Sequence, residues 1–304
     1  MLSLRRAAAC CSLIAILLQP SAFGWGDDGH QLINRVAAER VPDSMPQFLR
    51  AAADRIAYLG PEPDRWREMT EPQLKAAQEP DHFIDLERVA DMGEFPPSRY
   101  EFIRRLYEKR SRMAENADDY LPEKVGFQPY ITMEIYGRLK VAFREYRRLR
   151  AEKQSTQGVE QNIVFYAGWL GHYVGDAANP LHTTVRYNGW TGENPNGYTT
   201  AHTIHWEFEG SFVARNLKQL KFDDLVHAPI RLQDPFADYV HYLRESHKLV
   251  ERVYQLEKAG GLKGAGSPEA LEFVRQRLAT GAQMLLNLWY TAWEESAVPL
   301  PAKS

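Results

Sequence analysis

Residues 171–182 read Gly-His-Tyr-Val-Gly-Asp-Ala-Ala-Asn-Pro-Leu-His and carry the strongest local pattern in the chain. His172 and Asp176 are four positions apart, so on a helix their side chains lie next to each other on one face. An imidazole and a carboxylate placed in this way are natural zinc ligands. Pro180 then bends or ends the helix and lets His182 turn back toward the pair. A structural His–Asp pair on a helix surface is the alternative interpretation of the first two residues taken alone.

The sequence on both sides of this stretch has helical periodicity, and alternation typical of strands is nearly absent. Clusters of Gly, Pro and Asn end several of the apolar segments, as helix stops should. We therefore predict an all-α, single-domain bundle of many helices with an active-site cleft. The segments expected to be helical are 33–41, 98–119, 128–152, 161–177, 201–219, 235–257 and 268–296.

The first 24 residues have the pattern of a cleavable signal peptide. Two arginines precede an apolar run over 7–18, which is too short to span a bilayer comfortably, and Ala22 and Gly24 place small residues before a cleavage point. We expect residues 1–24 to be removed, the domain to comprise 25–304, and the protein to be secreted or periplasmic. A membrane anchor is the alternative, and no later segment is long and apolar enough to span a membrane.

Loss of this leader would change the charge and the cysteine content. The leader holds two arginines and no acidic residue, so its removal would shift the net charge from −3 to −5. A mildly acidic protein has no general attraction for nucleic acid or anionic lipid, so any handling of phosphate needs local positive charge. Cys10 and Cys11 also lie in the leader, so a metal site must be built from His, Asp, Glu and backbone groups.

Two further patterns supply potential metal ligands. His205 and Glu209, in the run His-Trp-Glu-Phe-Glu, repeat the spacing of four residues, and a salt-bridged surface pair is again the alternative. Asp64 and His82 belong to a proline-containing loop region and would add a carboxylate and an imidazole. Asp85 could accept a hydrogen bond from a ligand imidazole and orient it.

The predicted mature chain starts with Trp-Gly-Asp-Asp-Gly-His over residues 25–30. The free α-amine and the carbonyl of Trp25 can chelate a metal in a five-membered ring, and His30 could complete the set. A helix N-cap formed by Asp27 or Asp28 is the alternative, and both interpretations can hold at once. All these patterns together supply eight side chains and two terminal groups, which we interpret as one site.

These motifs, in this order, resemble the three-zinc superfamily that contains bacterial zinc-dependent phospholipases C and the single-strand-specific zinc nucleases of fungi and plants. The similarity runs from Trp25 to about Glu209 and is weaker in the last helices. It implies three zinc ions, which would be held by Asp64, His82, His172 and Asp176; by His182, His205 and Glu209; and by the amine and carbonyl of Trp25 with His30 and a bridging Asp176.

The resemblance also implies hydrolysis of a phosphodiester. Three zinc ions opposed by three carboxylates leave a local charge of about +3, which would bind a phosphate on an acidic protein. Zinc lowers the pKa of a bound water to roughly 7, so water becomes a nucleophile toward phosphorus at neutral pH. Asp64 could orient or deprotonate that water. Arg67 matches the position of a transition-state arginine in the nucleases, and a surface charge is its alternative role.

The sequence does not decide between two kinds of phosphodiester substrate, phospholipid and single-stranded nucleic acid. Glu209 resembles the phospholipases, because the nucleases usually have Asp there, whereas Arg67 and the Trp-Gly-x-x-Gly-His start are nuclease-like. Aromatic residues could bind a choline head group or stack on bases, and these are Phe83, Tyr187, Trp190 and Tyr198. We slightly favour a phospholipase C acting on phospholipid. A single-strand-specific endonuclease is the first alternative and a non-catalytic periplasmic zinc-binding protein the second, and no stable protein partner is implied.

Overall fold

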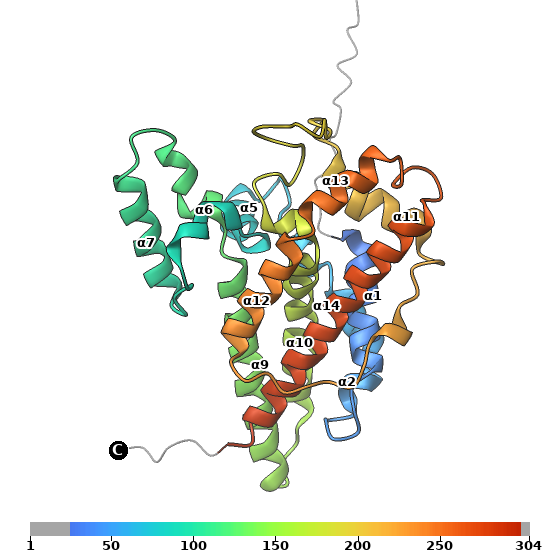
Figure 1. Ribbon diagram of the computed structural model, residues 1–304. Coiled ribbons are helices and arrows are strands. Elements are labelled where there is room, and N and C mark those ends of the chain that lie inside the picture. The colour runs from blue at the N-terminus through green and yellow to red at the C-terminus, as the bar shows by residue number, and fades with distance from the viewer. Residues whose placement is uncertain (1–24, 299–304) are drawn as a thin grey trace, which may run out of the picture.

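The computed structural model describes residues 25–298 (Figure 1). Residues 1–24 and 299–304 lie outside the described part, so the predicted signal peptide stays a prediction. The described residues form one domain of helices connected by loops and contain no β-strand, which confirms the predicted all-α class. None of the helices within residues 25–298 combines the length and apolarity that a membrane span requires.

The longer helices make up the body of the fold. The α-helices are α1 (Gly26–Glu39), α2 (Phe48–Ala51), α3 (Ala53–Leu59), α4 (Glu62–Arg65), α5 (Pro72–Gln78), α6 (Leu86–Val89), α7 (Arg99–Ser111), α8 (Pro122–Val125), α9 (Gln128–Ala151), α10 (Gln157–Ala178), α11 (Phe212–Asn216), α12 (Pro235–His247), α13 (Val250–Lys258) and α14 (Pro268–Glu295). Short 3₁₀ segments are η1 (Glu79–His82), η2 (Ala90–Met92), η3 (Ala117–Tyr120), η4 (Pro180–Thr183) and η6 (Asp223–Leu225), and η5 (Trp206–Ser211) is a π-helix.

Helix α10 is the centre of the bundle. It packs against α9, α14, α3, α1 and α12, and Figure 1 shows α14 crossing α9 and α10 obliquely. Residues 170–180 are all buried, so this half of α10 is enclosed around its whole circumference. Most of its side chains there are apolar or small, yet His172 and Asp176 lie among them. Burying an imidazole and a carboxylate is unfavourable unless both are paired or bind a cation.

Three predicted helices match closely and three are interrupted or shortened. The expected segments 128–152, 161–177 and 268–296 correspond to α9, α10 and α14. The predicted helix 98–119 is interrupted, because α7 ends at Ser111 and the next helical segment, η3, begins only at Ala117. The predicted helix 235–257 breaks where the Leu249 N–H bonds to the Ser246 carbonyl, which closes α12 before α13 begins. The predicted helix 201–219 starts later, at Ile204, and passes into the π-helix η5, because residues 201–203 form a bend and turns.

Close packing of α1 against α10 depends on Gly171. The Asn34 amide on α1 donates to the carbonyls of Ile56 (2.9 Å) and Gly168 (3.0 Å), which ties α1 to α3 and α10. A methyl group at Gly171 would clash with Asn34 Oδ1 and lie 2.8 Å from Leu285 Cδ2.

We expect Gly171→Ala to lower the free energy of unfolding by about 2–3 kcal/mol, because overpacking forces both helices apart. Gly137→Ala is the matched control, since a methyl group there meets no atom within 4 Å on α9. It should stabilise the helix by about 0.5–1 kcal/mol. Urea denaturation measures both, and equal stability of the Gly171 variant and the parent protein would contradict this packing.

Candidate metal centre

Asp176 is the common neighbour of the histidines that lie around α10. Its Oδ2 is 3.3 Å from His172 Nε2, as expected for residues four apart on a helix. Its Oδ1 is 3.3 Å from His30 Nε2 on α1, and its Oδ2 is 3.8 Å from His182 Nδ1 on η4. The carboxylate thus offers a different oxygen to His30 and to His172, which is the arrangement of a bridging ligand.

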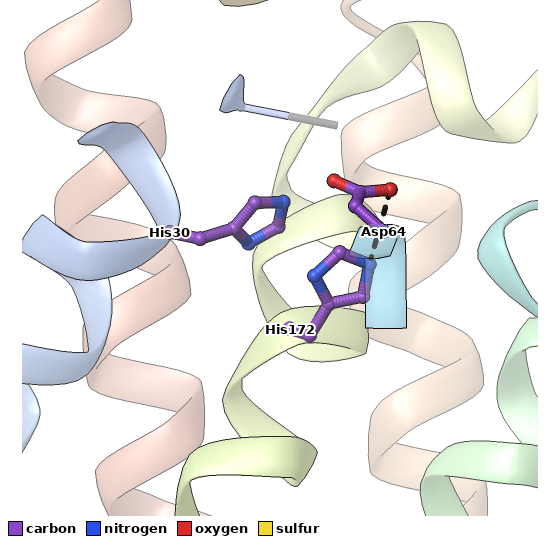
Figure 2. A group of neighbouring side chains, drawn as sticks. All are labelled: His30, Asp64 and His172. Atoms are coloured by element: carbon purple, nitrogen blue, oxygen red, sulfur yellow. Dashed lines mark ion pairs between the residues drawn. The ribbon is translucent and has the colours of Figure 1, made fainter. Parts of the chain in front are cut away.

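A second carboxylate approaches from α4. Figure 2 shows His30, Asp64 and His172 converging from three separate segments of the chain. The His30 and His172 rings are stacked, with their centroids 4.1 Å apart. Asp64 Oδ1 is 3.9 Å from His172 Nε2 and 3.6 Å from His82 Nε2 on η1. Two overlapping sets have ligand atoms within 4.8 Å of one another, and they are His30, Asp64 and His172, and His82, His172 and Asp176.

The third set consists of His182, His205 and Glu209, again within 4.8 Å. Glu209 Oε2 is 3.2 Å from His182 Nε2, and Glu209 Oε1 is 2.9 Å from His205 Nε2. His205 immediately precedes the π-helix that contains Glu209, and such segments occur frequently at functional sites. The structure therefore brings all eight predicted ligand side chains together, although metal binding by them stays a prediction.

Four of the imidazoles are held by backbone carbonyls through Nδ1. A carbonyl accepts from an N–H, so each of these Nδ1 atoms carries a proton and Nε2 faces the carboxylates, as in histidines that bind metals. Gln78 rather than Asp85 holds the ring of His82, so the role considered for that aspartate is wrong. The pairs are His82 with Gln78 (2.8 Å), His172 with Gly60 (2.9 Å), His182 with His82 (2.8 Å) and His205 with Tyr187 (3.1 Å).

The cluster contains many buried polar atoms that have no hydrogen-bond partner within residues 25–298. Such atoms are rare in folded proteins and costly, because they have lost water without gaining a partner. They are also the nitrogen and oxygen atoms that zinc prefers, so the residues present fit a metal centre. The atoms are both ring nitrogens of His30, Asp64 Oδ2, Nε2 of His82 and of His172, both oxygens of Asp176, and Glu209 Oε1.

Burial and charge shift the pKa values of the cluster in different directions. Burial lowers the pKa of His30, and burial together with Arg67 holds the pKa of His82 well below its usual range. Both rings are therefore neutral, as ligands must be. Burial raises the pKa of Asp64 in spite of His172 and Arg67, which suits a group that accepts a proton.

Trp25 lies beside the cluster at the start of α1. Its indole N–H donates to the carbonyl of Gly175 (2.7 Å), the residue before Asp176, and its ring packs on Phe208. The side chain is fully buried. No side chain caps α1, so the alternative of an aspartate N-cap is wrong. The position is compatible with chelation by the backbone of Trp25, which stays a prediction.

Arg67 and Phe83 flank the cluster. The Arg67 guanidinium is 3.1 Å from Asp64 Oδ1 and 3.7 Å from Glu79 Oε1, and only 12% of its side chain is exposed. It is therefore a partly enclosed partner of a predicted ligand and not a solvated surface charge, and its catalytic role stays a prediction. Phe83 follows His82, is half-buried, and accepts a hydrogen bond from Gln128 through its carbonyl.

The aromatic residues after η4 fall into two groups. Tyr187 is 54% exposed, and its ring meets the edge of the His205 ring at 5.8 Å, so it borders the cluster. Trp190 and Tyr198 pack on each other and on Tyr254. These contacts give the two rings a role in holding the loop, and substrate binding by any of the four predicted aromatics stays a prediction.

Access to the cluster is narrow. His205 and His182 retain 5% and 4% exposure, whereas His30, His172 and Asp176 retain none. A surface groove of about 610 Å³ between α9 and α10 lies elsewhere, and none of its lining residues is a predicted ligand. The side marked by His205 and Tyr187 is therefore the more open approach to the predicted ligands.

Comparisons with known proteins find resemblance in structure but not in sequence. No family model matches this chain, and neither does any curated protein. Among solved structures, the alpha toxin of Clostridium absonum has a TM-score of 0.48 at 12% identity, over 92% of this chain and 67% of that one. The alpha-toxin of Clostridium perfringens from an avian strain has a TM-score of 0.46 at 15% identity, over 91% and 65%. This chain thus spans about two thirds of the length of either toxin.

Proposed function

We propose that this protein is an exported, zinc-dependent phosphodiesterase of the phospholipase C type. The observation that carries the proposal is the buried cluster of five imidazoles and three carboxylates, four of whose rings are fixed through Nδ1. A structural network would satisfy its own polar atoms with hydrogen bonds, whereas within residues 25–298 most of the ligand atoms of this cluster lack a hydrogen-bond partner.

Three zinc ions fit the proposal, and when bound they would lower the pKa of water and polarise the oxygens of a phosphoryl group. Their net charge with three carboxylates is about +3, which suits an anionic diester. The proposed ligand sets are Asp64, His82, His172 and Asp176; His182, His205 and Glu209; and His30, Asp176 and the backbone of Trp25.

The side chains at the edge of the cluster have proposed roles in the reaction. Asp64 would orient a water molecule and accept its proton as the oxygen attacks phosphorus. Arg67 would hold a phosphoryl oxygen as negative charge develops there. The phosphorus–oxygen bond on the glycerol side breaks, and the leaving oxygen takes up a proton. The products are diacylglycerol and a phosphorylated head group. Tyr187 and Phe83, with the aromatic loop behind them, would contact the head group.

A single-strand-specific endonuclease is the alternative activity, and the pairing of Arg67 with Asp64 favours it. The two activities are tested side by side by incubating the purified protein with phosphatidylcholine vesicles and with single-stranded DNA, each with and without a chelator. Chelator-sensitive release of phosphocholine supports the phospholipase, and chelator-sensitive release of nucleotides supports the nuclease. Cleavage of neither substrate, with zinc bound, would contradict both and leave a zinc-binding protein.

His172→Ala and His241→Ala make a matched pair for this assay. His172 is fully buried in the cluster, whereas the His241 side chain on α12 is 73% exposed. Activity should disappear in the first variant and persist in the second.

A mature chain that starts at Trp25 is part of this proposal. We expect one extra glycine before Trp25 to cost the protein one bound zinc, because the chelating amine becomes an amide. Elemental analysis of the purified protein measures the metal content. One extra glycine after Ser304 is the control and should leave the zinc content unchanged. Full zinc content in the N-terminally extended protein would contradict chelation by the chain start.

A further inference from the structure

The cluster has two halves: the residues around Asp176, and the set formed by His182, His205 and Glu209. Asn179 lies between these halves and is completely buried. It ends α10 in an extended conformation, with φ −82° and ψ 117°. Its backbone N–H donates to the carbonyl of Asp176 (2.9 Å), and its own carbonyl accepts from the N–H of His182 (3.1 Å). The backbone of this one residue therefore sets the path from Asp176, in the first half, to His182, in the second.

The side chain of Asn179 makes two hydrogen bonds with opposite requirements. Its Oδ1 accepts from the Leu181 N–H (3.0 Å), which caps η4, and its Nδ2 donates to Glu209 Oε2 (2.7 Å). The amide orientation is fixed by these partners, because the reverse would place oxygen against carboxylate and N–H against N–H. Glu209 is thirty residues later in the sequence, so this is a tertiary contact.

This contact determines how Glu209 faces its histidines. Oε2 is held by Asn179 and by His182 (3.2 Å), while Oε1 points to His205 (2.9 Å) and accepts no hydrogen bond within the described residues. One carboxylate oxygen is thus anchored and the other is presented to the cluster. Donors that orient a ligand carboxylate in this way raise metal affinity, because the ligand does not have to be ordered on binding.

We propose that Asn179 is a positioning residue, which orients Glu209 for a cation bound by His182, His205 and Glu209 and links that cation to the Asp176 half of the cluster. The inference rests on the proposed metal centre but does not depend on the substrate. A purely structural role as the cap of η4 is the competing explanation, since the Oδ1 bond to Leu181 alone would account for an asparagine.

Asn179→Asp separates the two explanations, because aspartate keeps the oxygen that caps η4 and replaces only the donor to Glu209. It also places a second carboxylate against Glu209, and like charges at this distance repel. Asn179→Leu keeps the approximate volume and removes both bonds. Asn287→Leu is the control, since Asn287 on α14 is a largely buried asparagine whose partners, the Ile230 N–H and Gln283, lie outside the cluster.

The test is a zinc titration of the metal-free proteins against a chromophoric chelator, with urea denaturation run in parallel. In Asn179→Asp we expect one zinc ion to bind about 10–100-fold more weakly while the others keep their affinity. Asn287→Leu should lower stability and leave every zinc affinity unchanged.

Equal affinities for all ions in Asn179→Asp and the parent protein would overturn the inference and leave only the capping role. Uniform weakening of every ion, matching a loss of stability, would overturn it as well. If Asn179→Leu does not fold, the aspartate variant still decides between the explanations. A parent protein that binds no zinc would instead refute the proposed metal centre, so the two failures are distinguishable.

Discussion

Replacing Asp176 by alanine is expected to lower the proposed phosphodiesterase activity by about 1000-fold or more, equivalent to about 4 kcal/mol in activation free energy. Asp176 Oδ1 faces His30, and Oδ2 faces both His172 and His182. Its loss would leave three buried imidazoles without the carboxylate between them, and two of the proposed zinc sites would each lose a ligand. Activity is measured on the better of the two diester substrates, and zinc content is measured on the same samples.

Two variants define what the Asp176 result means. Asp176→Asn keeps the shape but not the charge, so it should lose zinc and activity nearly as completely. Asp54→Ala is the surface control, because that side chain on α3 is 91% exposed and forms an exposed ion pair with Arg35 on α1. It should change stability by no more than about 0.5 kcal/mol. Full activity of Asp176→Ala would refute the assignment of this cluster as the active centre.

The local geometry of the site is predictable from the sequence because it depends on helix periodicity. A spacing of four residues predicted adjacent side chains for His172 and Asp176 and for His205 and Glu209, and the two pairs are 3.3 Å and 2.9 Å apart. The turn at Pro180, which was expected to bring His182 back, ends α10 and places that ring 3.8 Å from Asp176. The all-α class followed from the same periodicity.

The parts that could not be predicted involve backbone groups far apart in the sequence. The carbonyl of Gly60 holds His172 although 112 residues separate them, and no residue type signals that a carbonyl will be an acceptor. The sequence indicated Tyr187 only as an aromatic ring that could bind substrate, and it gave no indication that the Tyr187 carbonyl holds the ring of His205. An asparagine before a proline, as at Asn179, is typical of a helix end, but the sequence does not predict its hydrogen bond to Glu209, which depends on tertiary structure.

Removing the proposed zinc ions with a chelator is expected to lower the melting temperature by more than about 10 °C. A ligand present at a thousand times its dissociation constant contributes about 4 kcal/mol to stability. In a domain of this size each kcal/mol corresponds to roughly 2–4 °C, so the loss of even one zinc ion is readily measured. The predicted mature chain has no disulfide to compensate. Adding zinc should restore the melting temperature, whereas magnesium should not, because the imidazoles suit zinc and magnesium requires oxygen ligands.

The stabilisation by zinc should also increase with pH between about 6 and 9. In the metal-free protein burial opposes protonation of His182, but the carboxylates of Asp176 and Glu209 outweigh burial and raise its pKa to about 9. Because the pKa of His182 is higher in the folded chain than in the unfolded chain, where it is about 6.5, protonation of His182 stabilises the metal-free fold. This contribution is complete below about pH 6.5 and is lost as the pH rises through 9. Zinc requires the neutral imidazole and competes with that proton. Melting curves with and without zinc at several pH values measure the gain, and a gain that stays constant or falls with pH would contradict His182 as a zinc ligand.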